Sequence, residues 1–188
     1  MSTFQTYLLL GFQHILNWMA LDHLLFILAI TCVYSFADLK RLFYLVSAFT
    51  VGHSITLALA TWQYVSFDSK WIEWLIPGTI LISAAANFSF KDRKIPRYTY
   101  GIVSAFGLIH GLGFSNYLQS LLGKEAAIVG PLFAFNVGLE IGQLIAVTLI
   151  LSFGSLLMHI FHIRQRTYVL VVSGIIIGLV IPMLIDRW

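Results

Sequence analysis

The sequence is poor in charged residues and in cysteine. Only 10% of its 188 residues are charged, whereas 59% are hydrophobic. A soluble domain carries about 25% charged residues, so this chain has too few to cover a water-exposed globule of its size. The single cysteine, Cys32, excludes an internal disulfide and any CxxC metal or redox motif. These shortages exclude a soluble enzyme, a nucleic-acid-binding module and a disordered chain.

Long apolar runs take up most of the chain. A membrane span needs about 20 mostly apolar residues, and six stretches meet this need. The predicted spans are residues 4–34, 42–64, 71–90, 98–122, 126–160 and 168–185. We therefore expect an all-α polytopic membrane protein, a six transmembrane helix bundle that forms one domain over residues 1–188. The stretch 126–160 is too long for a straight crossing and must tilt, protrude or break, with Gly154–Ser155 as the favoured break.

The lysines and arginines predict the orientation of this bundle. Eight of the 11 fall in the loops after the first, third and fifth spans. Because basic loops stay in the cytoplasm, both termini are expected on the outer side. The first residues, MSTFQTYLLL, hold no lysine or arginine before the apolar run. They are typical of the start of a span rather than of a secretory signal peptide.

Ionisable residues inside the predicted spans are the main functional signal. They are His14, Asp22, His23, His53, His110 and Glu140. Such groups are costly in hydrocarbon, so they usually face the bundle interior and serve a function. Counting about 1.5 Å per residue along each helix places most of them in one middle layer, with His14 nearer the outer face. The sequence therefore predicts a polar site at mid-membrane.

Imidazole and carboxylate groups together suit a divalent transition metal such as nickel, cobalt, zinc or copper. Calcium or magnesium would prefer a shell of oxygen atoms. A ligating histidine usually donates its other N–H to a neighbour, and Ser54, Asn136 and Gln143 are candidates for that role. A proton relay through the same histidines and carboxylates is the main competing interpretation. The remaining histidines, His159 and His162, are expected at the membrane interface.

Four stretches of the chain resemble a known family. They are GFQHILNWMALDHLLFIL (residues 11–28), FTVGHSITLALA (49–60), FGLIHGLGFSNYL (106–118) and FNVGLEIGQL (135–144). Together they resemble the shorter second branch of the HupE/UreJ family, small membrane proteins named for hydrogenase and urease accessory loci. The resemblance implies a six-helix protein of the bacterial inner membrane and suggests nickel or cobalt uptake. It also implies that Asp22, His23, His53, His110 and Glu140 carry the family motifs.

Two classes of function remain open at this point. A metal permease would admit a cation near His14 and release it towards the cytoplasm. In between, the ion would be held at mid-membrane by Asp22, His23, His53, His110 and Glu140. The alternative is an intramembrane zinc-dependent hydrolase for a lipid or acyl substrate, with Asp22 or Glu140 as the general base. A structural metal in an assembly partner is a third reading. The pair Gly174 and Gly178 would permit a homo-oligomer in the bilayer.

Overall fold

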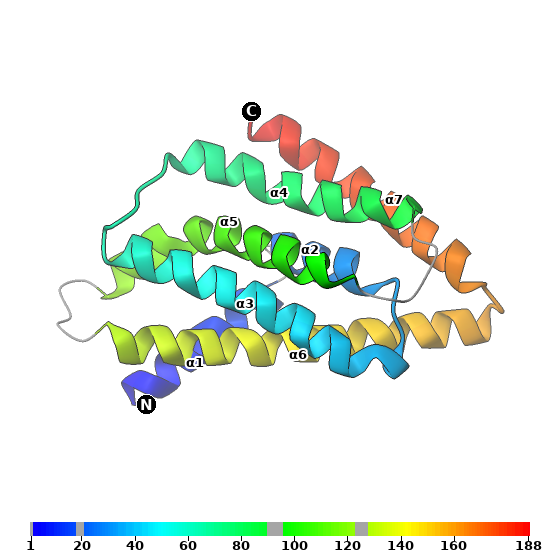
Figure 1. The fold of residues 1–188 in the computed structure, drawn as a ribbon, viewed down its shortest axis with the longest axis horizontal. Helices are drawn as coiled ribbons and strands as arrows, with labels where there is room; N and C mark the ends of the chain where they lie inside the picture. The colour runs from blue at the N-terminus through cyan, green and yellow to red at the C-terminus, as the bar shows by residue number, and fades with distance from the viewer. Residues whose placement is uncertain (1, 18–20, 90–95, 123–127) are drawn as a thin grey trace.

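The computed structural model describes residues 2–17, 21–89, 96–122 and 128–188, and these ranges contain helices and no strand. The helices are α1 (Thr3–Leu16), α2 (Leu21–Thr31), α3 (Leu39–Thr61), α4 (Ser69–Ala86), α5 (Arg97–Leu122), α6 (Val129–Ile160) and α7 (Gln165–Asp186), with short 3-10 turns η1 (Phe36–Asp38) and η2 (Asn87–Ser89). Figure 1 shows α1 and α6 along one side of the bundle, α4 and α7 along the opposite side, and α3 and α5 between them. The all-helical class is confirmed.

Four helical segments of the described chain are long and apolar enough to cross a membrane. They are Phe36–Thr61, Ser69–Ser89, Val129–Ile160 and Gln165–Asp186. The pair α1 and α2 adds a fifth if it is counted as one broken span. Helix α5 is long enough at 26 residues, but its histidine, serines and glycines lower its hydropathy. The protein is a membrane protein, and four or five of the six expected spans are found as candidates.

The first predicted span is not one straight helix. Helices α1 and α2 are bent by 66° relative to each other. Helix α1 ends at Leu16, and α2, with 11 residues, lies inside the bundle among α4, α6 and α7. An angular count along a single helix therefore does not describe how His14 and His23 are related. The bend lets the two side chains approach from different directions.

Helix α6 also differs from expectation at one point. It is a single helix of 32 residues with no break at Gly154–Ser155. Gly154 serves packing instead, because a Cβ at this position would lie 2.6 Å from the Tyr168 hydroxyl of α7. At about 1.5 Å per residue, α6 is roughly 48 Å long and must tilt or protrude beyond the hydrocarbon.

Glycines bring two pairs of helices into backbone contact. Between α1 and α6, a Cβ at Gly11 would lie 1.9 Å from the Phe135 carbonyl oxygen. Reciprocally, a Cβ at Gly138 would lie 1.9 Å from the Leu8 carbonyl oxygen. Only glycine permits such an approach, as in other membrane helix contacts. Helices α1 and α6 are therefore fixed against each other one turn away from His14.

Helices α3 and α5 are joined in the same way. A Cβ at Gly52 would lie 2.0 Å from the Ser104 carbonyl oxygen, and one at Gly111 would lie 2.3 Å from the His53 carbonyl oxygen. On α7, by contrast, Gly174 and Gly178 have no atom of the described residues within 4 Å of such a Cβ. The glycines of α3 and α5 hold the backbones that carry His53 and His110.

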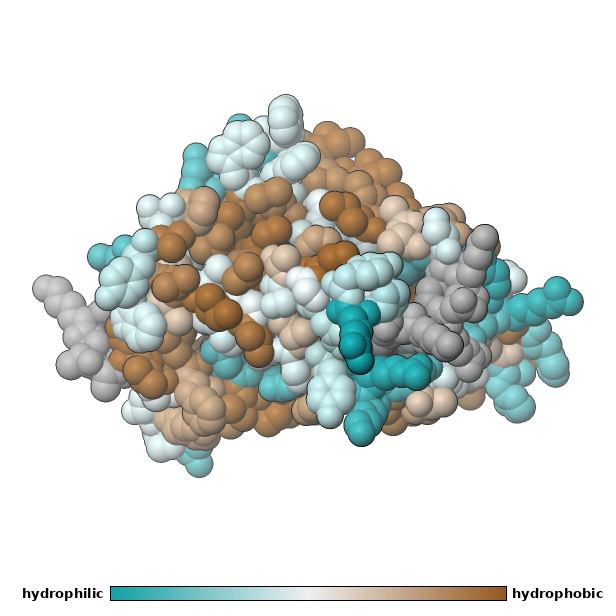
Figure 2. Space-filling view, viewed as in Figure 1, coloured by the Kyte–Doolittle hydropathy of each residue, from teal (hydrophilic) through white to brown (hydrophobic). Residues whose placement is uncertain are grey.

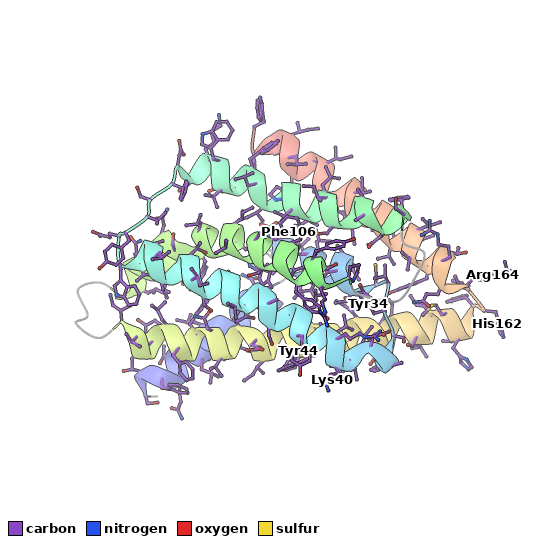
Figure 3. The ribbon with its side chains drawn as sticks, viewed as in Figure 1. Tyr34, Lys40, Tyr44, Phe106, His162 and Arg164 are labelled. Atoms are coloured by element: carbon purple, nitrogen blue, oxygen red, sulfur yellow. The ribbon has the colours of Figure 1, made fainter. Side chains whose placement is uncertain are left out.

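Most lysines and arginines of the described chain lie at one end of the bundle: five of the seven do, and Lys70 and Arg187 lie at the other end. Helices α3, α5 and α7 all begin at the end with the five basic residues (Figure 1). Figure 3 shows His162 and Arg164 at that end, and Figure 2 shows hydrophilic residues there beside a largely hydrophobic flank. Four further lysines and arginines lie outside the described residues: Lys91, Arg93, Lys94 and Lys124. Orientation in the membrane remains a prediction.

Candidate metal centre

Three histidines from three different helices meet inside the bundle. His14 of α1, His23 of α2 and His53 of α3 each offer one ring nitrogen, and these nitrogens all lie within 4.8 Å of one another. The ring centroids of His14 and His23 are 4.4 Å apart, and that of His53 lies 6.1 Å from His14 and 6.2 Å from His23. We call these three residues the histidine cluster. One metal ion bound by three imidazoles requires such spacing, since each Zn–N bond is about 2.0–2.1 Å.

Several nitrogens of the histidine cluster have no hydrogen-bond partner. His14 Nε2, His23 Nε2 and both ring nitrogens of His53 are buried and unpaired within the described chain. Buried polar atoms are nearly always paired, so a group of orphans at one place is unusual. Nickel, cobalt and zinc all accept neutral imidazole as a ligand. The donor set therefore fits a divalent transition metal.

His110 of α5 lies next to the cluster. Its ring centroid is 5.1 Å from that of His23, and its Nε2 is 2.9 Å from Thr79 Oγ1. The Thr79 hydroxyl donates its one proton to the Ile76 carbonyl at 2.7 Å, so it accepts from His110 Nε2–H. That leaves the lone pair on His110 Nδ1, which is buried and without a partner. An imidazole oriented by an outer hydrogen bond is the usual form of a metal-binding histidine.

The sequence does not indicate this role for Thr79. Thr79, Ser83 and Asn87 follow one another every four residues, a spacing that is typical of hydrogen bonds between neighbouring helices. Ser83 donates to the Thr79 carbonyl, and Asn87 donates to the Ala29 carbonyl of α2 and to Ser173 of α7. The three residues therefore face different neighbours. The contact between Thr79 and His110 becomes visible only in the folded bundle, where the two side chains face each other.

Asp22 is held by the end of α7. Its Oδ2 accepts from both Nη1 and Nη2 of Arg187 at 3.3 Å, and Arg187 also donates to the Glu73 carbonyl of α4. Asp22 Oδ1 is buried and has no partner within the described chain. Asp22 directly precedes His23 in the sequence, and the Arg187 guanidinium neutralises the charge of the Asp22 carboxylate.

Glu140 lies apart from the histidine cluster. Its carboxylate accepts a short hydrogen bond from Ser47 of α3. One turn further along α6, Gln143 Oε1 accepts from Thr50 at 2.8 Å. Ser47 and Thr50 precede His53 on α3, so these contacts lie on the side of the cluster where α3 begins. Together they form a polar seam between α3 and α6.

Asn136 and Ser54, two candidates for orienting a metal-bound histidine, form hydrogen bonds within their own helices. The Asn136 side chain lies next to His53, and its Nδ2 donates to the Leu132 carbonyl. Ser54 donates to the Thr50 carbonyl of its own helix at 2.6 Å. His159 and His162 are exposed near the end of α6, away from the histidine cluster.

Aromatic rings surround the histidines, a feature that sequence analysis did not identify. Phe49 and Phe26 lie 5.2 Å from the His110 ring, and Phe114 lies 4.1 Å from the His14 ring. Phe135 stacks on His53 with centroids 6.3 Å apart. These rings help to bury His23, His53 and His110, whereas His14 stays partly accessible. The sequence has 15 phenylalanines, and the neighbouring residues do not distinguish a ring that packs on histidine from one that faces lipid.

Fold and site together define a class: a small, all-helical membrane protein with a buried cluster of histidines from separate helices. A comparison with protein families identifies the particular one. The model described as "HupE / UreJ protein" matches residues 1–186, so the chain belongs to the HupE/UreJ family. This is a family of accessory membrane proteins related to nickel and cobalt handling. Searches of curated proteins and of solved structures found no match.

Proposed function

We propose that this protein is a membrane permease for a divalent transition metal, with nickel or cobalt as the preferred cargo. The observation that carries the proposal is the group of three ring nitrogens within 4.8 Å of one another, buried and contributed by three helices. A lone intramembrane histidine is often a packing residue. Three convergent imidazoles with unpaired nitrogens are better suited to holding a cation.

The candidate residues form three groups: the histidines, Asp22, and the polar side chains between α3 and α6. His14, His23 and His53 bind the ion, and His110 supplies a fourth nitrogen from its side of His23. Asp22 contributes negative charge beside His23 when Arg187 releases it. Glu140 and Gln143 offer oxygen ligands between the cluster and the end at which α3 begins. A cation that leaves the imidazoles in that direction meets the Glu140 carboxylate next, with Asn136 and Ser54 near the start of that path.

The membrane potential supplies a driving force. The basic ends of α3, α5 and α7 are proposed to face the cytoplasm of a bacterial inner membrane, with six crossings and both termini outside. A divalent cation moving inward through about 100 mV gains roughly 2 × 2.3 kcal/mol. That energy is enough to drive accumulation against a concentration gradient without a nucleotide-binding domain.

Reconstituted protein provides the direct test. Proteoliposomes with an inward-negative potential are expected to take up Ni²⁺ or Co²⁺, and His53→Ala is expected to abolish the uptake. His159→Ala is the matched control, because it removes an exposed histidine outside the cluster. Absence of potential-driven uptake of nickel, cobalt, zinc or copper by the unaltered protein would contradict the proposal.

One observation favours a second candidate, the intramembrane zinc-dependent hydrolase. Three histidines with an open position are a common catalytic zinc site, and His14 borders a groove with several apolar side chains. A lipid or acyl chain could reach a zinc-bound water along such a groove. This alternative predicts that purified protein retains zinc and cleaves lipid or acyl esters, with both properties lost in His53→Ala.

A further inference from the structure

A groove on the flank of the bundle leads to the histidine cluster. It has a volume of about 710 Å³ and runs between α1 and α5. His14 lines it, and His14 is the member of the cluster that is not fully buried. His23 and His53 do not line it. Gln13 and Asn17 provide polar groups beside His14, while apolar side chains form the rest of its α1 wall. His14 is therefore the point at which the cluster meets the groove.

The Phe114 ring lines this groove beside His14. Its centroid is 4.1 Å from that of His14, and it stacks on Phe135 at 4.9 Å with an angle of 17° between the rings. Phe135 in turn stacks on His53. His14 Nε2 is buried although His14 lines the groove, so a cation in the groove reaches this nitrogen only if a neighbouring side chain moves. Because the Phe114 ring is packed on both neighbours, it must rotate or shift to let an ion pass.

A second hollow continues the route outwards. It has a volume of about 560 Å³ and lies where α3 and α5 end and α4 begins. Glu73, Gln63 and Asn116 contribute polar side chains to its lining. Tyr117 borders both hollows, and its ring lies 5.1 Å from that of Phe114, one helical turn away on α5. Carboxylate and amide oxygens suit a cation that still carries water ligands.

We propose that a hydrated divalent cation reaches the histidine cluster by passing from the polar hollow at Glu73, across Tyr117, into the groove at His14, with Phe114 as the gate. The inference rests on the proposed function, because it assumes that the cluster binds a cation. His53 lies eight residues before α3 ends at Thr61, about 12 Å along the helix. The path from this end is therefore shorter than the path from the other end. The gate separates the cation from bulk water without contributing a ligand.

Exchange kinetics test the gate. Co²⁺ binding by detergent-purified full-length protein is followed by stopped-flow absorbance, and removal is followed after addition of EDTA. Phe114→Ala and the milder Phe114→Leu are expected to accelerate both steps, the former by at least about tenfold, and to change the dissociation constant by less than about threefold. Phe133→Ala is the control, because Phe133 lies on the same helix as Phe135 but is 63% exposed. It is expected to leave both rates unchanged.

The outcomes separate the gate from the metal site. Tight Co²⁺ binding with unchanged rates in both Phe114 variants overturns the gate and leaves the metal site intact. A large loss of affinity without faster exchange also overturns it, because Phe114 would then hold the cluster together. If Phe114→Ala does not fold, Phe114→Leu decides. Failure of the unaltered protein to bind Co²⁺ removes the proposed function and the gate together.

The outer hollow has its own variant. Glu73→Gln removes a carboxylate from the proposed approach while keeping the shape of the side chain. It is expected to slow Co²⁺ association several-fold at low salt and to leave dissociation unchanged. An unchanged association rate would remove the Glu73 hollow from the route.

Discussion

At the scale of residues, the hydroxyl of Thr79 decides which nitrogen of His110 is available to a metal. The hydroxyl proton is used by the Ile76 carbonyl, so the hydroxyl oxygen accepts from His110 Nε2–H. The lone pair of His110 is then on Nδ1. Groups that orient metal-binding histidines in this way typically change affinity by about 10–100-fold when removed.

Thr79→Val tests this role. The substitution keeps the shape of the side chain and removes the hydroxyl, so we expect Co²⁺ affinity to fall by about tenfold or more if His110 is a ligand. Thr79→Ser restores the hydroxyl and is expected to retain most of the affinity. Both variants are compared by titration and by thermal unfolding, because a loss of stability alone would appear in the second measurement. Equal affinity for Val and Ser variants would argue that His110 does not bind the ion.

The histidines could be identified from the sequence, but not all of their partners. His14, His23, His53 and His110 could be singled out because four imidazoles inside apolar runs are unusual, although one alone is often a packing residue. The equal depth of Glu140 suggested a shared site, yet depth along a helix does not say which way a side chain points. In the structure Glu140 faces Ser47. Thr79 was hidden because its partner is distant in sequence and set by packing alone.

At the scale of elements, the close contacts of α1 with α6 and of α3 with α5 hold the site together. Both depend on glycines that face backbone carbonyls. Two glycines four residues apart take part on each of α5 (Gly107 and Gly111) and α6 (Gly138 and Gly142). The bend between α1 and α2 could not be predicted, because residues 4–34 form one apolar run in which no proline or glycine marks an interruption after Gly11. That bend brings His14 and His23 together.

Gly52→Ala tests the contact between α3 and α5. A methyl group at this position would meet the Ser104 carbonyl oxygen at 2.0 Å. We expect it to push the helices apart and destabilise the protein by about 1–3 kcal/mol, the usual cost of overpacking. Gly174→Ala is the matched control, because no atom of the described chain lies within 4 Å of the added carbon. Thermal unfolding in detergent should show a lower transition temperature for Gly52→Ala and an unchanged one for Gly174→Ala. Equal stability of the two variants would contradict this account.

At the scale of the whole molecule, the two ends of the bundle differ. Most of the described lysines and arginines lie at one end, and the polar hollow at Glu73 lies at the other. Ser66 lies at the hollow, and Ala37 lies in η1 at the basic end; both are exposed. The native cysteine, Cys32, is buried. Introduced cysteines at the two exposed positions can therefore report which end faces outwards.

Labelling in intact cells tests the orientation. A membrane-impermeant maleimide is expected to modify Ser66→Cys from outside and to leave Ala37→Cys unmodified until the membrane is permeabilised. The physical reason is that lysine and arginine loops are retained in the cytoplasm. The reverse pattern would place the basic end outside and would require the proposed transport direction to be reconsidered.

The most direct test of the central claim is the metal stoichiometry of purified protein after equilibration with Ni²⁺ or Co²⁺. The cluster predicts about one ion per chain, lost when His23 and His53 are replaced by alanine and kept when the exposed His159 and His162 are replaced, since removing two of three ligands leaves little affinity. X-ray absorption at the metal edge should then show imidazole nitrogen ligands. No bound metal, or binding that is lost equally in both double variants, would contradict the account.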